Sequence, residues 1–247
     1  MKVVFHEDFY GVYSFEPAAL TGRMEAVIRS LGNRFEFVQA VAAEPKDIEA
    51  VHGAKHIAYV RSQGLYDIAA LAAGGAAQAA AIGLKEPAFA LIRPPGHHAS
   101  QDDAWGFCYF NNMSVALKRL LADGRIKTAA VLDFDLHYGD GNVNILSETG
   151  LVDIFNPEAR DRHVYLDKVT SFLENVETDI IGISAGFDNH KEDWGGLLET
   201  EDYRLMGRLV KEAAKKTGAG YFGILEGGYN HKVLGQNVLA LLEGMSA

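Results

Sequence analysis

The sequence predicts an α/β fold of three layers, α/β/α, in which helices cover both faces of a central, mostly parallel sheet. Short apolar runs alternate along the chain with stretches of helical periodicity. The runs are almost continuously apolar, which is typical of parallel strands buried on both faces. Polar residues gather directly after four of these runs, where open α/β sheets bind their ligands.

Six segments are expected to be buried strands because each is a near-continuous run of apolar residues. They cover residues 3–5, 35–41, 88–94, 128–135, 179–187 and 220–227.

Helical patterns lie between these runs. In 18–31, the residues Leu20, Met24, Val27, Ile28 and Leu31 form one apolar stripe at helical spacing. The Ala-rich segment 65–84 contains Gly74-Gly75, which indicates a helix packed closely against a neighbour. The remaining helices are expected at 110–122, 166–175, 201–216 and 233–245.

Length and composition indicate one globular domain over residues 1–247. The net charge is −10 with no basic cluster, so we expect no nucleic-acid partner. The acidity suits a cationic substrate, although solubility alone also explains it. No apolar run reaches the roughly 18 residues of a membrane span, and the N-terminus turns polar too early for a signal peptide. The single cysteine, Cys108, excludes an intrachain disulfide and favours a cytoplasmic protein.

The first polar cluster offers metal ligands. Asp135 and His137 are two residues apart, so in extended backbone they project to the same face. Asp188, after another apolar run, supplies a third ligand, and three protein ligands with an open position are typical of catalytic zinc sites. An isolated Asp-x-His is more often a hydrogen-bonded pair, but Asp188 and a nearby His-His pair favour the metal.

Two further aspartates are candidates for supporting roles. Asp133 shares the face of Asp135 but lies one pleat deeper, where it could orient a histidine or bind a monovalent cation with main-chain carbonyls. Asp140 lies in a Gly-Asp-Gly turn and could orient a second histidine, although such aspartates usually only form the turn. The histidines would be His97 and His98, one acting as general base and the other as general acid or electrostatic catalyst.

Tyr229 follows Gly227-Gly228, which let the backbone turn sharply. Its hydroxyl is a neutral donor suited to a developing oxyanion, although a tyrosine there could simply pack. The aromatic loop 105–112 could line an apolar tunnel or belong to the core. Together these parts suit hydrolysis of an amide or ester, and no nucleophilic-serine, phosphate-loop or dinucleotide motif is present.

Five motifs make the chain similar to the histone deacetylase superfamily, which includes bacterial acetylpolyamine amidohydrolases and acetoin-utilisation proteins. They are RPPGHHA (93–99), GFCYFNN (106–112), DFDLHYGDG (133–141), SAGFDNH (184–190) and EGGYN (226–230). They stand in the family's order, and the resemblance covers nearly the whole chain. Glu226 in the last motif is closer to the class II and bacterial branches. The resemblance implies the arginase/deacetylase fold, with about eight strands, but not arginase itself, which needs two manganese ions and more carboxylates.

The resemblance also implies the cofactors. Zn²⁺, or Fe²⁺ as an equally compatible ion, would be held by Asp135, His137 and Asp188. A structural K⁺ would be bound by Asp133 with the main-chain carbonyls of Asp135 and His137.

For catalysis, the resemblance implies that His97 and His98 form a pair oriented by Asp133 and Asp140 respectively. Tyr229 would polarise the acyl carbonyl, while Phe107, preceded by Gly106, would form one wall of the acyl-lysine channel.

Two regions depart from the family pattern. The loop between 55–63 and the helix at 65–84 is short, and an aspartate that grips the substrate backbone has no match there. Between Asn142 and Thr178, the glycine-rich segment whose phenylalanine faces Phe107 is missing. These losses predict a shallower and wider mouth unless a partner subunit closes it.

We therefore expect a zinc-dependent deacetylase that removes an acyl group, chiefly acetyl, from an acylated amine such as an acetylpolyamine or acetyl-lysine. The alternatives are a deacylase or esterase for longer acyl or ester substrates, and a low-activity module that binds acyl ligands. The oligomeric state is left open, a homo-oligomer included.

Overall fold

The computed structural model describes residues 1–246 and contains a seven-stranded sheet, all of whose strands run parallel. The strand order is β2-β1-β3-β7-β6-β4-β5. The strands are β1 (Lys2–Phe5), β2 (Glu36–Gln39), β3 (Ala88–Ala90), β4 (Ala129–Asp133), β5 (Val152–Phe155), β6 (Ile180–Ala185) and β7 (Gly220–Leu225). The predicted α/β class is thus confirmed, with seven strands where about eight were expected.

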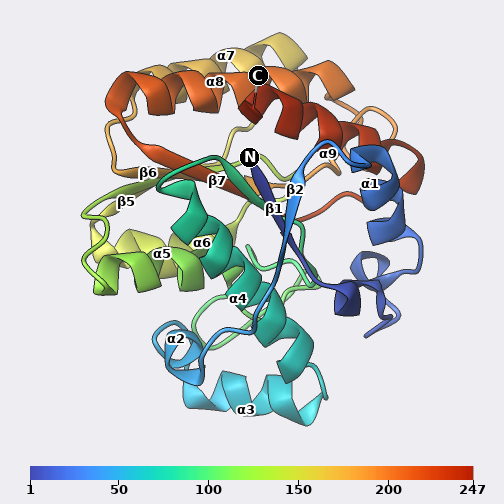
Figure 1. Cartoon of the computed structure of the whole chain (residues 1–247), viewed down its shortest axis with the longest axis vertical. Helices are drawn as coiled ribbons and strands as arrows, with labels where there is room; N and C mark the ends of the chain where they lie inside the picture. The colour runs from blue at the N-terminus through green and yellow to red at the C-terminus, as the bar shows by residue number, and fades with distance from the viewer. Residues whose placement is uncertain (247) are drawn as a thin grey trace.

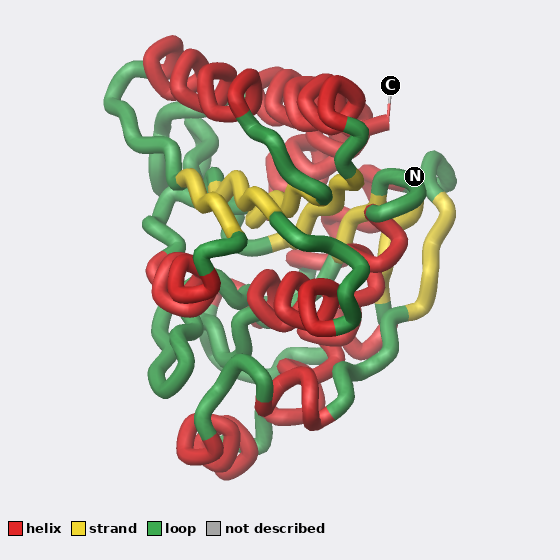
Figure 2. The backbone as a smooth tube through the Cα atoms, turned by 90° about the vertical axis from the view of Figure 1, so that its left-hand side faces the viewer, coloured by secondary structure: helices red, strands yellow, loops and turns green. Residues whose placement is uncertain are grey.

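Helices cover both faces of the sheet, which gives the three predicted layers (Figures 1 and 2). On one face, α1 packs against α9, α9 against α8 and α8 against α7; on the other, α4 packs against α5. The helices are α1 (Arg23–Leu31), α2 (Pro45–Glu49), α3 (Ala54–Ser62), α4 (Tyr66–Gly83), α5 (Asn112–Ala122), α6 (Asp140–Leu146), α7 (Arg162–Asn175), α8 (Thr200–Thr217) and α9 (His231–Ser246).

The six predicted strands are all present, but one of them was expected to be buried and is not, and a seventh strand was missed. The strand expected at 35–41 is β2, an edge strand whose residues are mostly exposed rather than buried. β5 was not predicted, because its four residues, VDIF, include a charge and pair with one neighbour only.

The first predicted helix starts later than its apolar stripe suggested. Residues Pro17–Ala19 form a short 3₁₀ turn, and α1 begins at Arg23. Leu20 therefore lies outside the helix and is 45% exposed, whereas Met24, Val27 and Leu31 are fully buried. The apolar stripe therefore predicts burial correctly for residues within α1, but not for Leu20 before it.

The close packing predicted around Gly74-Gly75 is confirmed. A Cβ atom on Gly74 would overlap the backbone of Val41 and Ala43, so the chain after β2 crosses α4 in direct contact. In the same region the Gly75 position faces the side chains of Ile92 and Ala40.

The sheet brings the candidate residues to one edge. Asp133, at the end of β4, pairs with Ser184 of β6, and Ala185 of β6 pairs with Leu225 of β7. Since the strands are parallel, the loops after β4, β6 and β7 leave the sheet side by side, together with the loop after β3.

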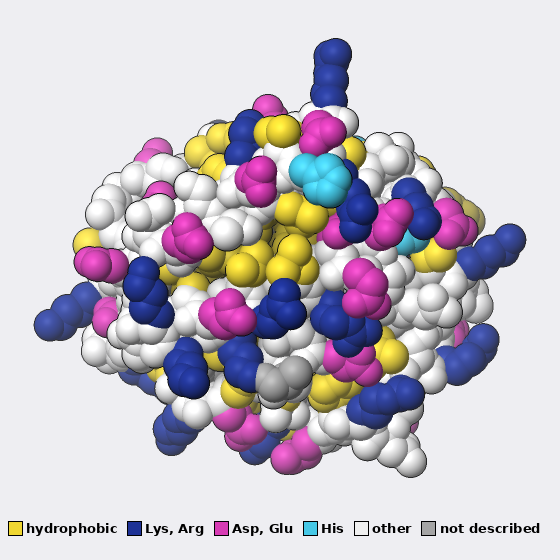
Figure 3. All heavy atoms as spheres, turned by 90° about the horizontal axis from the view of Figure 1, so that it is seen from above, with side chains coloured by type: hydrophobic (Ala, Val, Ile, Leu, Met, Phe, Trp, Pro, Cys, Tyr) yellow, Lys and Arg dark blue, Asp and Glu magenta, His cyan; other side chains and the backbone are white. Residues whose placement is uncertain are grey.

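On the face shown in Figure 3, Lys and Arg side chains are interspersed with Asp and Glu, and neither sign forms a continuous area. None of the helices in residues 1–246 combines the length and the apolarity that crossing a bilayer requires.

Candidate metal centre and catalytic site

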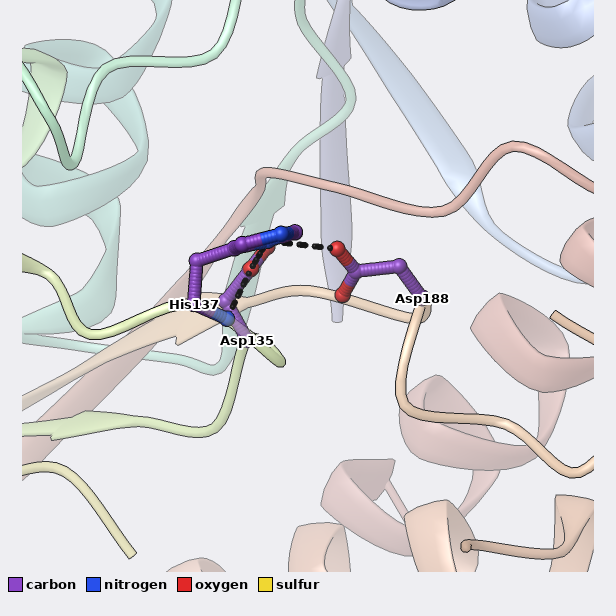
Figure 4. A group of neighbouring side chains, drawn as sticks. All are labelled: Asp135, His137 and Asp188. Atoms are coloured by element: carbon purple, nitrogen blue, oxygen red, sulfur yellow. Dashed lines mark hydrogen bonds and ion pairs between the residues drawn. The ribbon is translucent and has the colours of Figure 1, made fainter. Parts of the chain in front are cut away.

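Asp135, His137 and Asp188 converge at the carboxyl edge of the sheet (Figure 4). One ligand atom from each lies within 4.8 Å of the others. His137 Nδ1 is 3.2 Å from Asp135 Oδ1 and 3.1 Å from Asp188 Oδ2. Asp135 and His137 come from the loop after β4, not from the strand itself, yet both turn toward the same point as Asp188 from the loop after β6.

The charges of this triad fit a divalent cation. Asp135 and Asp188 are both buried, and burial together with the charge of Asp135 raises the pKa of Asp188 above its usual value. Asp188 Oδ2 is buried and has no hydrogen-bond partner, although it lies close to His137 Nδ1. Burying a carboxylate oxygen without a hydrogen-bond partner costs free energy, and a bound cation would offset that cost. The three side chains are therefore suitable ligands for a cation.

The imidazole of His137 lies close to both carboxylates. The hydrogen bond with Asp135 and the close carboxylate of Asp188 raise its pKa to about 10 despite partial burial. When no cation is bound, the imidazole of His137 therefore carries a proton, and its positive charge lies between the carboxylates of Asp135 and Asp188. Metal binding at such a site would displace that proton.

Two histidine–aspartate pairs lie beside the triad. His97 Nδ1 is 3.3 Å from Asp133 Oδ2, and His98 Nδ1 is 2.7 Å from Asp140 Oδ1. The two imidazole rings are 3.9 Å apart between centroids. The structure thus brings together the same pairs that the sequence suggested.

The environments of the two histidines differ. Burial would lower the pKa of His97, but the carboxylates of Asp135 and Asp133 outweigh it and raise that pKa well above the usual value. For His98, burial and the neighbouring His97 lower the pKa to about 4. Two adjacent imidazoles with opposite shifts are typical of acid–base sites.

Asp133 occupies the deeper position expected for it. It is the last residue of β4 and is 1% exposed. Besides His97, its Oδ2 accepts a hydrogen bond from Asn142 Nδ2 at 3.0 Å, and its Oδ1 accepts a long one from the Asp135 amide. Burial raises the pKa of Asp133, and the charge and hydrogen bond of His97 offset only part of that effect.

Glu226 joins three strand ends and was noticed in the sequence only as a family marker. It is fully buried, and its Oε2 accepts hydrogen bonds from the amides of Gly96 at 2.7 Å and His97 at 3.3 Å. Its Oε1 accepts a hydrogen bond from Ser184 Oγ at 3.3 Å. The position of the His97 backbone thus depends on a residue after β7.

Arg23 anchors the same loop from the other side and was missed by the sequence analysis. The side chain is fully buried at the start of α1; its Nε donates to the Gly228 carbonyl at 2.9 Å and its Nη2 to the Glu226 carbonyl. No local pattern distinguishes Arg23 from a surface arginine, so only the tertiary structure could reveal this role.

Tyr229 belongs to an aromatic group that also includes His137 of the triad, through Trp194. Its ring is 5.7 Å from Phe107, edge to face, and 4.1 Å from Trp194, nearly stacked. Its amide donates to Asp193 Oδ2 at 2.8 Å. Burial raises its pKa well above the usual value, so the hydroxyl keeps its proton and can donate a hydrogen bond.

The loop that carries Phe107 needs unusual backbone angles. Gly106 has φ +58°, and Phe107 has φ +67°, a value that a bulky residue rarely adopts. A Cβ on Gly106 would overlap the His98 ring, so this glycine allows the loop to lie directly against the histidine. Trp105 of the same loop stacks on His98 at 3.7 Å, and its Nε1 donates to Asp140 Oδ2 at 2.8 Å.

A parallel sheet that presents two carboxylates and an imidazole at its carboxyl edge, beside paired histidines, defines a hydrolase with a candidate metal site. The family follows from comparison with known proteins. The model of the histone deacetylase domain matches residues 16–165 and 158–245, so the chain belongs to this family.

Relatives agree with this family. A probable deacetylase of Methanothermobacter thermautotrophicus is 28% identical over 98% of this chain and 90% of its own length. The histone deacetylase-like amidohydrolase of Pseudomonas aeruginosa is 26% identical over 89% of this chain and 73% of its own. The acetylpolyamine amidohydrolase of Mycoplana ramosa is 30% identical over 64% of this chain and 56% of its own.

The fold has a close match among solved structures. The crystal structure of the HDA15 HD domain superposes with a TM-score of 0.82 and covers 98% of this chain and 88% of its own. The two sequences are 23% identical, so this likeness concerns the fold alone.

Proposed function

We propose that this protein is a metal-dependent deacetylase that removes a short acyl group, chiefly acetyl, from an acylated amine such as an acetylpolyamine or acetyl-lysine. The observation that carries the proposal is the buried Asp135–His137–Asp188 triad, whose Asp188 oxygen lacks a hydrogen-bond partner, next to two His–Asp pairs. Family membership narrows the chemistry to deacetylases and amidohydrolases.

Asp135, His137 and Asp188 would hold the metal, for which Zn²⁺ and Fe²⁺ are both compatible with an Asp₂His donor set. When bound, such an ion supplies Lewis acidity to an acyl carbonyl and to a water molecule.

His97 and His98 would move the protons of the reaction. Water adds to the acyl carbon, one imidazole takes the proton that this water loses, and the C–N bond then breaks. We assign to His98 the return of a proton to the departing nitrogen. Since its pKa is lowered to about 4, His98 would first accept that proton from the attacking water, and the products are a carboxylic acid and an amine. Asp133 and Asp140 hold the two rings by their Nδ1 atoms, so each Nε2 lies on the other side of its ring, and that of His97 is 3.8 Å from Asp135 Oδ1.

Tyr229 would stabilise the negative charge that develops on the acyl oxygen. Its hydroxyl is protonated at neutral pH, and a neutral donor in a partly dry site is well suited to this task. Arg23 and Asp193 hold the Tyr229 loop in place.

A structural K⁺ beside the site is part of the proposal. Asp133 would bind it together with the main-chain carbonyls of Asp135 and His137. The support is the burial of the Asp133 carboxylate, whose negative charge a monovalent cation would help to balance. A cytoplasmic location and a single catalytic domain over 1–247 stay predictions from the sequence.

One panel of substrates tests the function. We would measure hydrolysis of acetyl-lysine and acetylpolyamine amides, longer-acyl amides and esters, each with and without a chelator. Chelator-sensitive hydrolysis of the acetyl amides, above that of the others, is the expected result. Preference for long acyl or ester substrates would replace the deacetylase by a deacylase or esterase, and no chelator-sensitive hydrolysis would favour an acyl-binding module.

A further inference from the structure

We propose that Trp194 forms the second wall of the acyl site and limits the length of the acyl group. This inference rests on the proposed function. The sequence offers no counterpart to a channel wall facing Phe107, because the connection between β5 and α7 contains only residues 156–161. The structure places an aromatic ring from a different loop, the one after β6, next to the candidate site.

The contacts of the Trp194 ring support this assignment. It lies nearly parallel to the Tyr229 ring, 4.1 Å away and inclined by 27°. It also meets the His137 ring edge to face at 6.1 Å and the Phe107 ring at 6.5 Å. One side chain thus touches a candidate metal ligand, the candidate oxyanion donor and the first channel wall.

The backbone of Trp194 is held firmly. Asp193 Oδ1 accepts the Trp194 amide at 2.9 Å, while Asp193 Oδ2 accepts the amides of Tyr229 and Asn230 at 2.8 and 2.7 Å. The side chain of Asn230 in turn donates to the Glu192 carbonyl. Because Asp193 binds both loops, the backbones that carry Trp194 and Tyr229 are held next to each other.

About half of the Trp194 surface is open to solvent. Trp194 is 53% exposed, although its neighbours Asp188 and Asn189 are buried. A tryptophan that packs on one side and leaves the other open presents apolar area that a ligand could cover. Phe107, itself only partly buried, stands on the adjoining side.

The ring spacing suggests the size of the acyl group. The ring centroids of Phe107, Trp194 and Tyr229 lie 4.1 to 6.5 Å apart, so the rings contact one another and the indole occupies space that a longer acyl chain would need. Removal of the indole should admit longer chains, and a single methylene in such a pocket changes selectivity by about tenfold or more.

Selectivity is the main test. We would measure kcat/KM for acetyl, butyryl and octanoyl forms of one lysine amide with wild type, Trp194→Phe and Trp194→Ala. Trp194→Ala should raise the octanoyl-to-acetyl ratio by about tenfold or more, with Trp194→Phe in between. An unchanged ratio in Trp194→Ala would overturn the inference. If wild type itself hydrolyses none of the amides, the proposed function fails instead.

Trp105 provides a matched control, since it is 51% exposed but stacks on His98 at 3.7 Å. Trp105→Ala should lower turnover for all chain lengths by a similar factor and leave the ratio unchanged. If Trp105→Ala shifts the octanoyl-to-acetyl ratio as much as Trp194→Ala does, the limit on acyl length cannot be assigned to Trp194 in particular.

Fluorescence gives a second readout that needs no turnover. The chain has two tryptophans, so Trp105→Phe leaves Trp194 as the only one. In metal-depleted Trp105→Phe protein, where the substrate stays intact, titration with the acetyl-lysine amide should change the Trp194 emission and saturate. An emission that stays constant up to the solubility limit of the amide would contradict contact between Trp194 and the acyl group.

Discussion

The centre and the edges of the sheet differ in burial and in chemistry. In β4 and β6 every residue is buried, whereas β2 and β5 are mostly exposed or half-buried. The candidate ligands and Tyr229 follow the central strands β4, β6 and β7, and no candidate catalytic residue follows β2 or β5.

This difference shows where a parallel sheet can build a site. A central strand has hydrogen-bonded neighbours on both sides, so the loops that leave it start from fixed positions. Charged groups at these ends are buried, and the charge of one can shift the pKa of another, as Asp135 raises the pKa of Asp188. At the edges of the sheet, the side chains of β2 and β5 are largely in contact with water. The predictions below compare the two kinds of position.

The largest effect is expected for Asp188→Asn. The substitution removes a charged ligand from the triad, so the protein should lose its metal and, on the order of 10³-fold, its hydrolytic rate. Metal content and acetyl-lysine hydrolysis would be measured together. Asp153→Asn on the exposed edge strand β5 is the control and should change neither. Full metal content in Asp188→Asn would contradict its role as a ligand.

Tyr229→Phe should keep the metal but lower turnover by roughly 10²- to 10³-fold, because it deletes one oxyanion donor. The matched control is Tyr221→Phe on β7, whose hydroxyl donates to the Met245 carbonyl at 2.7 Å near the opposite end of the strand. That variant should lose a little stability, about 1 kcal/mol, and no activity. Turnover of wild-type size in Tyr229→Phe would exclude the proposed role.

Asp140→Asn should have a smaller effect, about tenfold to a hundredfold on kcat, since it weakens the orientation of His98 without touching the reacting atoms. The metal should stay bound. Trp105→Phe removes the hydrogen bond to Asp140 Oδ2 but keeps an aromatic ring that can stack on His98, so it should cost less. Equal losses of kcat in the two variants would indicate that the indole of Trp105, and not the charge of Asp140, determines the orientation of the His98 ring.

The smallest effect concerns the region beyond the edge strand β5. Asp161 caps α7 by accepting the amides of His163 and Val164, and these hydrogen bonds, chiefly that of Val164, lower its pKa. Its contribution to stability is therefore present above the unfolded-state pKa of about 3.9 and is lost as the pH falls through the lowered folded-state pKa.

We expect Asp161→Ala to lower Tm at pH 7 by a few degrees, roughly 2–4 °C, with the gap to wild type narrowing toward pH 3 and activity unchanged. Asp167→Ala, inside the same helix and exposed, is the control and should not lower Tm. A gap that stays constant with pH would show that the cap does not depend on the charge of Asp161.

The same contrast explains what could be predicted from the sequence. The central strands appear as continuous apolar runs, and Asp135, His137 and Asp188 could be grouped because parallel strands end at one edge. The edge strand β5 has no such run. Glu226, Arg23 and Trp194 were missed because their partners are distant in sequence, and no local pattern reports a contact that only packing creates.

Glu226 has a consequence for how the protein responds to heat. One carboxylate binds the amides of Gly96 and His97 and the hydroxyl of Ser184, and so connects the chain after β3, the end of β6 and the loop after β7. Loosening the catalytic loops therefore requires disrupting a contact of the core. Such coupling makes the site and the core one cooperative unit, in which activity and tertiary structure should be lost in the same thermal transition.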